Sequence, residues 1–251
     1  MNRELKQKYW QLKKEIKGLD SAIVAFSGGI DSTLVLKAAH DVLHNKVIAV
    51  TADSPSLPRK ELEETKNIAR QIGARHLIIN TEETENENYL KNPSNRCYYC
   101  KSELYSKLKI IAAQFGIKDI INGTNFDDIG DYRPGLEAAD KNNVINPLKE
   151  AKLTKNEIRE LAKHLGLETW DKPSSPCLSS RVPYGQEITM KKLEMIEEAE
   201  NFLQDFGIRE LRVRHFSNMA RIEVNENDKS IISDNFISIQ KKFSEIGFNE
   251  I

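Results

Sequence analysis

The sequence has almost no net charge, few cysteines and no long apolar run, and each absence excludes a class of protein. Its 251 residues include 37 Lys and Arg against 38 Asp and Glu, a formal net charge of −1. A nucleic-acid-binding protein more often carries a basic face, so the composition disfavours RNA as a partner. No stretch approaches the ~20 apolar residues that a membrane span needs, and the charged segment 1–19 lacks a signal-peptide core. We therefore expect a soluble, cytoplasmic protein.

Three cysteines are too few for a disulfide scaffold in a chain of this length. An odd count in a cytosolic protein favours metal binding or catalysis. Cys97 and Cys100 form a C-x-x-C pair, a spacing that lets two thiolates reach one metal. Cys177 lies in a separate loop, where nearby Arg181 is expected to lower the pKa of the thiol. Three thiolates suit a 4Fe-4S cluster with one iron open, whereas zinc would need a fourth ligand such as a histidine.

Short apolar runs alternate with amphipathic segments over the first two thirds of the chain. Periodicity predicts buried strands at residues 22–26, 47–52, 76–80, 119–122 and 144–148. It predicts helices at residues 3–17, 33–43, 61–72, 102–115 and 155–165. Such alternation implies crossover connections and a parallel sheet with helices on both faces.

The pattern changes after a Pro- and Ser-rich loop over residues 170–185. A long helix (189–206), two short strands and a last helix (231–246) follow, which is typical of a small α+β domain. We therefore expect a doubly wound, mostly parallel α/β domain over residues 1–185 and a small α+β domain over residues 186–251.

Residues 27–32, Ser-Gly-Gly-Ile-Asp-Ser, lie between the first predicted strand and the following helix. Glycines there let backbone amides approach an anion, and the helix dipole favours phosphate. Ser27 and Ser32 can donate hydroxyl hydrogen bonds, and Asp31 can hold a Mg²⁺ that bridges phosphate oxygens. No Lys follows Gly28 and Gly29, so this is not the loop of kinases and GTPases. It resembles the signature of the PP-loop ATP pyrophosphatases, which transfer AMP to a substrate oxygen and release pyrophosphate.

Two further positions fall at the predicted carboxyl ends of strands, where ligands of such sheets gather. Asp53 closes the second strand, and Gly123 opens the segment Gly-Thr-Asn-Phe-Asp-Asp after a later strand. A glycine there allows close backbone approach to a nucleotide, and the carboxylates of Asp127 and Asp128 can support Mg²⁺. Asp53 and Gly123 are therefore candidate nucleotide-binding residues.

Together with residues 170–173 and 212–214, these motifs resemble the LarE family. Its members are ATP-dependent sulfur transferases, the pyridinium-3,5-bisthiocarboxylic acid mononucleotide synthases of nickel-pincer cofactor biosynthesis. The resemblance spans nearly the whole chain and is most specific in loop 176–181, Pro-Cys-Leu-Ser-Ser-Arg. It implies that ATP adenylates a carboxylate of pyridinium-3,5-biscarboxylic acid mononucleotide, after which sulfur displaces AMP. It also implies a small-molecule partner and a homo-oligomer, with the helix from Thr189 as a contact surface.

The resemblance also assigns roles around the substrate. Arg212 and Arg214, two apart on a predicted strand, point to the same face, and by resemblance they bind the substrate's phosphate through guanidinium forks. Ser180 and Arg181 would line the same pocket. Glu200, on the long helix, is a candidate for a metal or phosphate site at a subunit contact, although a solvated helix face is the better expectation.

The family has two known sulfur sources. Members with a single cysteine, matching Cys177, sacrifice its sulfur and are left with dehydroalanine. Members with three cysteines hold a 4Fe-4S cluster that carries an additional sulfide. The chain resembles the cluster type, with Cys97, Cys100 and Cys177 as the iron ligands.

Three other interpretations stay open. A cluster-dependent tRNA thiolase also joins a PP-loop to cysteines, but the chain has no basic RNA-binding extension. A synthetase of the GMP or NAD type would leave the cysteines idle, and no glutaminase domain is present. A non-catalytic nucleotide- or metal-sensing module is the third, and the intact loop and Cys177 count against it.

Overall fold

The structure, a computed structural model, describes residues 1–130 and 134–251. These residues form two compact units. The first consists of Met1–Ser54, Arg59–Glu83 and Cys97–Ser175, and the second of Pro55–Pro58, Thr84–Arg96 and Pro176–Ile251. The sequence suggested a boundary at residue 186, whereas the second unit takes in loop 176–185 and two short earlier segments. A division into an ATP domain and a substrate domain stays a prediction.

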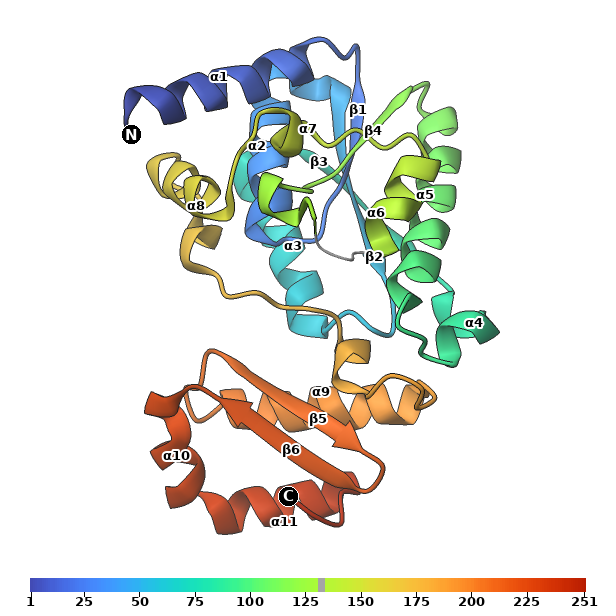
Figure 1. Cartoon of the computed structure of the whole chain (residues 1–251), viewed down its shortest axis with the longest axis vertical. Helices are drawn as coiled ribbons and strands as arrows, with labels where there is room; N and C mark the ends of the chain where they lie inside the picture. Colours follow the sequence, from blue (N-terminus) through green and yellow to red (C-terminus); the bar gives the residue numbers. More distant parts are fainter. Residues whose placement is uncertain (131–133) are drawn as a thin grey trace. The chain divides into compact units, whose positions relative to one another are not determined.

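Four parallel strands among the described residues form the sheet of the first unit, in the order β3-β2-β1-β4 (Figure 1). Their bounds are β1 (Ala22–Ala25), β2 (Val47–Asp53), β3 (Arg75–Asn80) and β4 (Asp119–Ile121). The chain runs outward from β1 to β3 and then places β4 on the other side of β1. The strand order therefore reverses between β1 and β4, and ligands of open α/β sheets bind at such a switch point.

Helices cover both faces of this sheet, as Figure 1 shows. One face packs on α1 (Arg3–Lys17), α2 (Ile30–Leu43), α3 (Arg59–Ile72), α7 (Pro147–Glu150) and α8 (Lys155–His164). The other packs on α5 (Arg96–Gln114) and α6 (Pro134–Lys141). The expected doubly wound α/β fold with a parallel sheet is confirmed.

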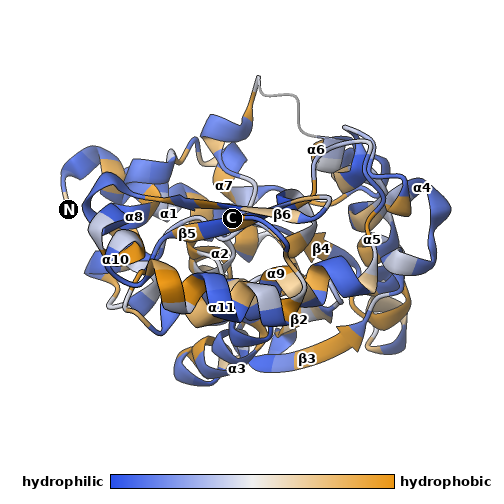
Figure 2. Ribbon diagram, turned by 90° about the horizontal axis from the view of Figure 1, so that it is seen from below, coloured by the Kyte–Doolittle hydropathy of each residue, from blue (hydrophilic) through white to orange (hydrophobic). Residues whose placement is uncertain are grey.

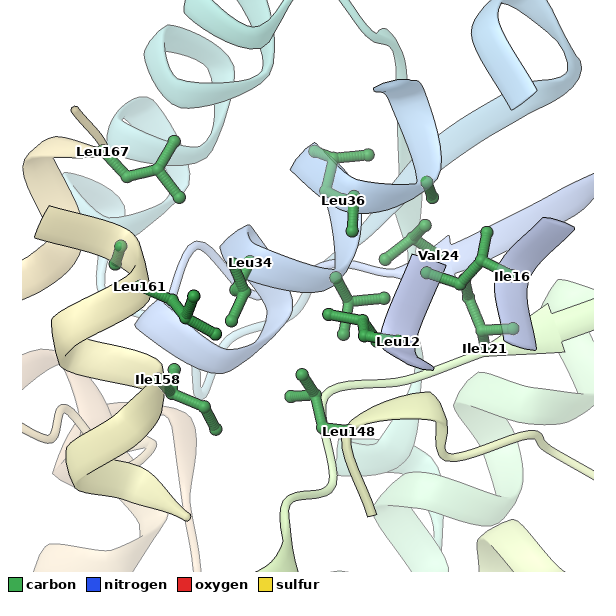
Figure 3. Close-up of a cluster of buried hydrophobic side chains, with 14 of the residues drawn as sticks. Leu12, Ile16, Val24, Leu34, Leu36, Ile121, Leu148, Ile158, Leu161 and Leu167 are labelled. Atoms are coloured by element: carbon green, nitrogen blue, oxygen red, sulfur yellow. The ribbon is translucent and has the colours of Figure 1, made fainter. Parts of the chain in front are cut away.

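Residue alternation along β1 explains why both faces are apolar. Val24 belongs to the core under α1 and α2, whereas its neighbour Ile23 belongs to the core under α5. Successive side chains of a strand point to opposite faces, so a strand covered on both sides has to be apolar throughout. Figure 3 shows the first core, in which Leu12 of α1, Leu34 of α2 and Leu161 of α8 gather with Val24.

Two expected boundaries in the first unit differ from the structure. No strand forms over residues 144–148 of the described chain: Ile145 makes a single bridge to Ile121, and α7 already begins at Pro147. Helix α5 begins at Arg96 rather than Ser102, so it includes the C-x-x-C pair in its first turn.

The second unit contains a two-stranded antiparallel sheet among its described residues, β5 (Leu211–Phe216) and β6 (Met219–Val224). Its helices are α4 (Glu87–Leu90), α9 (Met190–Gln204), α10 (Lys229–Asp234) and α11 (Phe236–Ile246). Helices α9 and α11 pack on β5 through a core that contains Leu203, Val213 and Phe243. Figure 2 shows hydrophobic and hydrophilic residues alternating along α11. The expected last helix is two helices, because the chain breaks at Asn235.

Within the described part of the chain, no helix combines the length and apolar character that crossing a membrane requires.

Candidate nucleotide and sulfur-transfer site

Of the two glycines in the loop after β1, Gly28 is the one that the structure requires, and it does so for two separate reasons. Gly28 has a φ of +71°, and a Cβ there would lie 2.8 Å from the Cγ2 of Thr65. Gly29 has an extended backbone, and among the described residues a Cβ there would meet just one heavy atom within 4 Å, the hydroxyl oxygen of Ser27 at 3.5 Å. Gly29 is the N-cap of α2 and has no side chain with which to cap the helix. The first amides of α2 therefore stay available to an anion.

The two serines of the loop have different roles. Ser32 is buried, and its hydroxyl donates to the carbonyl oxygen of Gly29 at 3.0 Å and accepts from the amide of Ser27 at 3.3 Å. Ser27 is exposed, and its hydroxyl lies 3.2 Å from that of Ser32. Ser32 thus fixes the shape of the loop, whereas the hydroxyl of Ser27 faces solvent and is the one available to a ligand.

Gly123 lies beside this loop because β4 neighbours β1. A Cβ at Gly123 would lie 2.7 Å from the amide nitrogen of Ser32 and 3.1 Å from the Cβ of Asp31. The sequence suggested that this glycine allows a nucleotide to approach. The structure adds a packing reason, since the backbone after β4 lies directly against the start of α2, and a nucleotide contact at Gly123 stays a prediction.

Asp31 is held by a lysine that the sequence did not single out. The Nζ of Lys155 lies 2.5 Å from the Oδ2 of Asp31, and the amide of Asn125 donates to Oδ1 at 3.4 Å. Lys155 is the first residue of α8, and its backbone amide donates to the carboxylate of Asp127 at 2.7 Å. A Mg²⁺ at Asp31 would share this carboxylate with the ammonium group. Its binding there stays a prediction.

Two other carboxylates near the strand ends, those of Asp128 and Asp53, form hydrogen bonds or ion pairs with nearby residues. Asp128 accepts from the backbone amide of Asn125 and completes a capping box. Asp53 ends β2, and its carboxylate lies 2.5 Å from the guanidinium of Arg59 at the start of α3. A nucleotide contact by Asp53 stays a prediction.

Lys172 reaches the loop from a distant part of the first unit. Its Nζ lies 2.6 Å from Glu61 and 2.5 Å from Glu64, both on α3, and 3.5 Å from the carbonyl oxygen of Gly28. The Lys172 side chain is only 15% exposed. Burial alone would lower the pKa of this ammonium group, but the hydrogen bonds to Glu61 and Glu64 outweigh it and raise the pKa. Lys172 therefore stays charged at neutral pH.

None of the three cysteines forms a disulfide, and they are divided between the units. Cys97 and Cys100, three apart on the first turn of α5, lie on one side of that helix in the first unit. Cys177 belongs to the second unit. Over residues 1–130 and 134–251, no group of three or more His, Cys, Asp or Glu side chains is arranged to hold a metal ion. As a donor set three cysteine thiols fit an iron–sulfur cluster, but the cluster itself stays a prediction.

A buried ion pair organises the loop around Cys177. Arg181, 4% exposed, donates through Nε and Nη2 to the two carboxylate oxygens of Glu200 at 2.9 and 3.1 Å. Its Nη1 donates to the carbonyl oxygens of Pro176 and Cys177. The expectation of a solvated face for Glu200 is wrong, since this residue is 7% exposed. Arg181 and Glu200 together fix the backbone on either side of the thiol.

The carboxylate of Glu200 also accepts a hydrogen bond from β5, the strand that carries the two arginines predicted to bind phosphate. Glu200 accepts from the amide of Val213 at 2.9 Å, and Val213 lies between Arg212 and Arg214 on β5. Arg214 donates to the carbonyl oxygen of Ser180 at 3.1 Å and pairs with Glu223 at 2.8 Å. Val213 is buried in the core, so the two arginines lie on the opposite face of the strand.

Arg212 is less constrained than its neighbour. Arg212 is the cross-strand neighbour of Glu223 and helps to lower the pKa of that carboxyl group. Among the described residues no hydrogen bond or close ion pair holds its guanidinium, which is therefore freer than that of Arg214 to meet an anionic ligand. The second unit therefore brings Cys177, Ser180, Arg181 and Arg214 into one connected group, with Arg212 beside it.

Segment 84–96 supports this group, although the sequence gave no sign of it. The hydroxyl of Tyr89 lies 2.6 Å from that of Ser179, and the guanidinium of Arg96 donates to the Ser179 carbonyl oxygen at 2.9 Å. Arg96 also donates to Asn92 at 2.6 Å, and Asn92 donates to the carbonyl oxygen of Val182. The contacts of this segment with residues 179 and 182 join positions 83 to 90 residues apart, so no local sequence pattern predicts them.

The sequence of this chain is similar to those of several known proteins. The family model of the queuosine biosynthesis protein QueC matches residues 21–94. The uncharacterized protein slr1717 of Synechocystis is 47% identical over 88% of this chain and 82% of its own length. The uncharacterized protein MJ0830 of Methanocaldococcus jannaschii is 31% identical over 96% of this chain and 91% of its own.

A third relative decides the family. The pyridinium-3,5-bisthiocarboxylic acid mononucleotide synthase of Lactiplantibacillus plantarum is 35% identical over 240 residues, which cover 94% of this chain and 86% of the relative. The chain belongs to the LarE family. Because the match covers 94% of the chain, it includes the greater part of each unit.

Proposed function

We propose that the chain is an ATP-dependent sulfur transferase that adenylates the carboxylates of pyridinium-3,5-biscarboxylic acid mononucleotide and converts them to thiocarboxylates. The observation that carries this proposal is the connected group of Cys177, Ser180 and Arg214 in a chain 35% identical to a mononucleotide synthase of that product. The loop at the switch point between β1 and β4 would bind the ATP that such a reaction consumes, since ligands of open α/β sheets bind at such points.

The first step activates the carboxylate. A carboxylate oxygen of the substrate attacks the α-phosphorus of ATP, the bond to the β-phosphate oxygen breaks, and pyrophosphate leaves. The amides at the start of α2 and the hydroxyl of Ser27 would hold the departing phosphates, where negative charge accumulates. Asp31 would hold the Mg²⁺ that accompanies them, in exchange for its contact with Lys155.

The second step exchanges oxygen for sulfur. A sulfur nucleophile attacks the carbonyl carbon of the acyl adenylate, and AMP leaves with the bridging oxygen. Arg212 and Arg214 would bind the phosphate of the mononucleotide, since a guanidinium fork matches two phosphate oxygens. The Arg181–Glu200 pair would hold the Cys177 backbone in place during this step, which restricts the positions that the thiol can take.

We propose a 4Fe-4S cluster on Cys97, Cys100 and Cys177 as the sulfur source. When bound, such a cluster would supply an additional sulfide at its open iron. The alternative is Cys177 itself: its Sγ attacks the adenylate, a base removes the Cα proton, and the Cβ–Sγ bond breaks. That route leaves dehydroalanine at position 177 and allows one sulfur per protein chain.

The proposal is tested by anaerobic incubation with ATP, Mg²⁺, sulfide and the pyridinium mononucleotide. We expect pyrophosphate release that depends on the mononucleotide, together with a product mass that reflects oxygen-to-sulfur exchange at each carboxylate. Cys177→Ser should retain pyrophosphate release and lose the thiocarboxylate, because it removes the sulfur and leaves the loop after β1 unchanged.

Other outcomes would favour the alternatives. Thiolation of purified tRNA, with no reaction of the mononucleotide, would identify a tRNA thiolase. ATP binding without pyrophosphate release under any of these conditions would identify a sensing module. We also propose a homo-oligomer, and light scattering that gives the mass of a single chain would contradict it.

A further inference from the structure

The loop after β1 has no lysine of its own, and the structure provides one from elsewhere in the chain. Lys172 lies 144 residues from Gly28 in sequence, yet its ammonium group lies 3.5 Å from the Gly28 carbonyl oxygen. We propose that Lys172 binds the β- or γ-phosphate of ATP, and afterwards the pyrophosphate, at this loop. This inference rests on the proposed function only in so far as it names the loop as the phosphate site.

Lys172 donates three hydrogen bonds, and the acceptor of one of them can be exchanged for a ligand atom. Glu61 and Glu64 accept at 2.6 and 2.5 Å, which are strong charge-assisted hydrogen bonds. The contact to Gly28 is at the 3.5 Å limit of a hydrogen bond and goes to a neutral oxygen. A phosphate oxygen beside the loop is a better acceptor because it is charged. The donor can therefore change from the Gly28 carbonyl to phosphate while both glutamates keep their positions.

The two glutamates orient the lysine rather than only neutralising it. With a side chain 15% exposed between two acceptors on one helix, the Nζ has little freedom to move. Such preorganisation lowers the cost of binding an anion. Two glutamates against one lysine also leave one net negative charge near the loop, which would repel a phosphate. Glu64 is 53% exposed and is therefore screened by water and salt, whereas Glu61 at 18% is the partner that fixes the position.

The test measures binding of inorganic pyrophosphate and of AMP by calorimetry with Mg²⁺ present, so it requires no sulfur transfer. Loss of a charge-assisted hydrogen bond costs about 10- to 100-fold in affinity. We expect Lys172→Gln to weaken pyrophosphate binding by about that factor and to leave AMP binding within about twofold. Lys37→Gln is the matched control, because Lys37 is also ion-paired, to Asp41 at 2.6 Å, but lies further along α2.

A triple variant separates phosphate binding from a purely structural ion pair. Lys172→Gln leaves two glutamates unpaired, and combining it with Glu61→Gln and Glu64→Gln removes that repulsion. If Lys172 binds phosphate, the affinity of the triple variant for pyrophosphate stays below that of the wild type. Recovery of wild-type affinity in the triple variant would overturn the proposal, and so would unchanged affinity in Lys172→Gln or a wild-type chain that binds no pyrophosphate. Lys172-dependent pyrophosphate binding without a thiocarboxylate product would contradict the proposed function and leave this inference standing.

Discussion

Gly28→Ala should destabilise the first unit through two separable terms. The residue has a φ of +71°, and an added Cβ would lie 2.8 Å from the Cγ2 of Thr65. A left-handed backbone costs a residue with a Cβ about 1–2 kcal/mol. Forcing a methyl group into a packed position costs about 1–3 kcal/mol more. The expected loss is therefore about 2–5 kcal/mol, a large part of the ~5–15 kcal/mol that holds a typical domain folded.

Urea unfolding and thermal melting measure this loss. For a chain of this size the melting temperature should fall by roughly 4–20 °C, at ~2–4 °C per kcal/mol. Gly116→Ala is the matched control: its φ is +65°, and no heavy atom of the described chain lies within 4 Å of its Cβ position. It should therefore lose the backbone term only.

A second substitution isolates the packing term. Thr65→Ser removes the methyl group that the new Cβ would meet and keeps the hydroxyl that donates to the Leu62 carbonyl oxygen at 2.7 Å. In the Gly28→Ala background it should recover most of the packing cost, because the two residues are in contact. Equal losses for Gly28→Ala and Gly116→Ala would refute the reasoning.

Three further predictions concern the remaining site residues. Glu200→Gln should lower the free energy of unfolding by about 3–5 kcal/mol in urea titrations, because it leaves Arg181 buried without a countercharge; a loss below 1 kcal/mol would contradict this. The hydrogen bond from Arg214 lowers the pKa of Glu223 below its ordinary 4.5, so the pair stabilises above that pH and the benefit is lost as the pH falls through the lowered pKa. The stability difference between wild type and Glu223→Gln should therefore be constant at neutral pH and shrink below about pH 4.5. Cys97→Ala should abolish iron binding after anaerobic reconstitution while ATP binding, measured by calorimetry, is unchanged; full iron content in this variant would exclude the proposed cluster.

Local patterns were sufficient to predict the elements that carry the ATP loop. The apolar run before Ser27 is β1, which is covered on both faces of the sheet, and the segment after Asp31 is α2, which packs on one of those faces. The sequence also predicted β5, where Arg212 and Arg214 alternate with buried residues. Only β5 shows the two-residue period of a strand, whereas β1 and α2 are recognised as short apolar segments on either side of the glycine loop.

The contacts between distant segments could not be predicted in this way. Lys172 meets Gly28, and Arg181 meets Glu200, only after the chain has folded. Charged residues in loops and on helices are usually solvated, which is why Glu200 was expected to be exposed. The start of α5 was also missed: the amide of Arg96 donates to the carbonyl oxygen of Pro93, and the helix begins there without a strong sequence signal.

The central claim is that ATP cleavage at the loop after β1 serves thiolation of a carboxylate. The most direct measurement counts pyrophosphate and thiocarboxylate in the same anaerobic reaction, with the mass of residue 177 determined after turnover. We expect one pyrophosphate for each thiocarboxylate formed, and repeated turnover with Cys177 intact. Pyrophosphate release that is independent of the mononucleotide, or that is not matched by any thiocarboxylate, would contradict it.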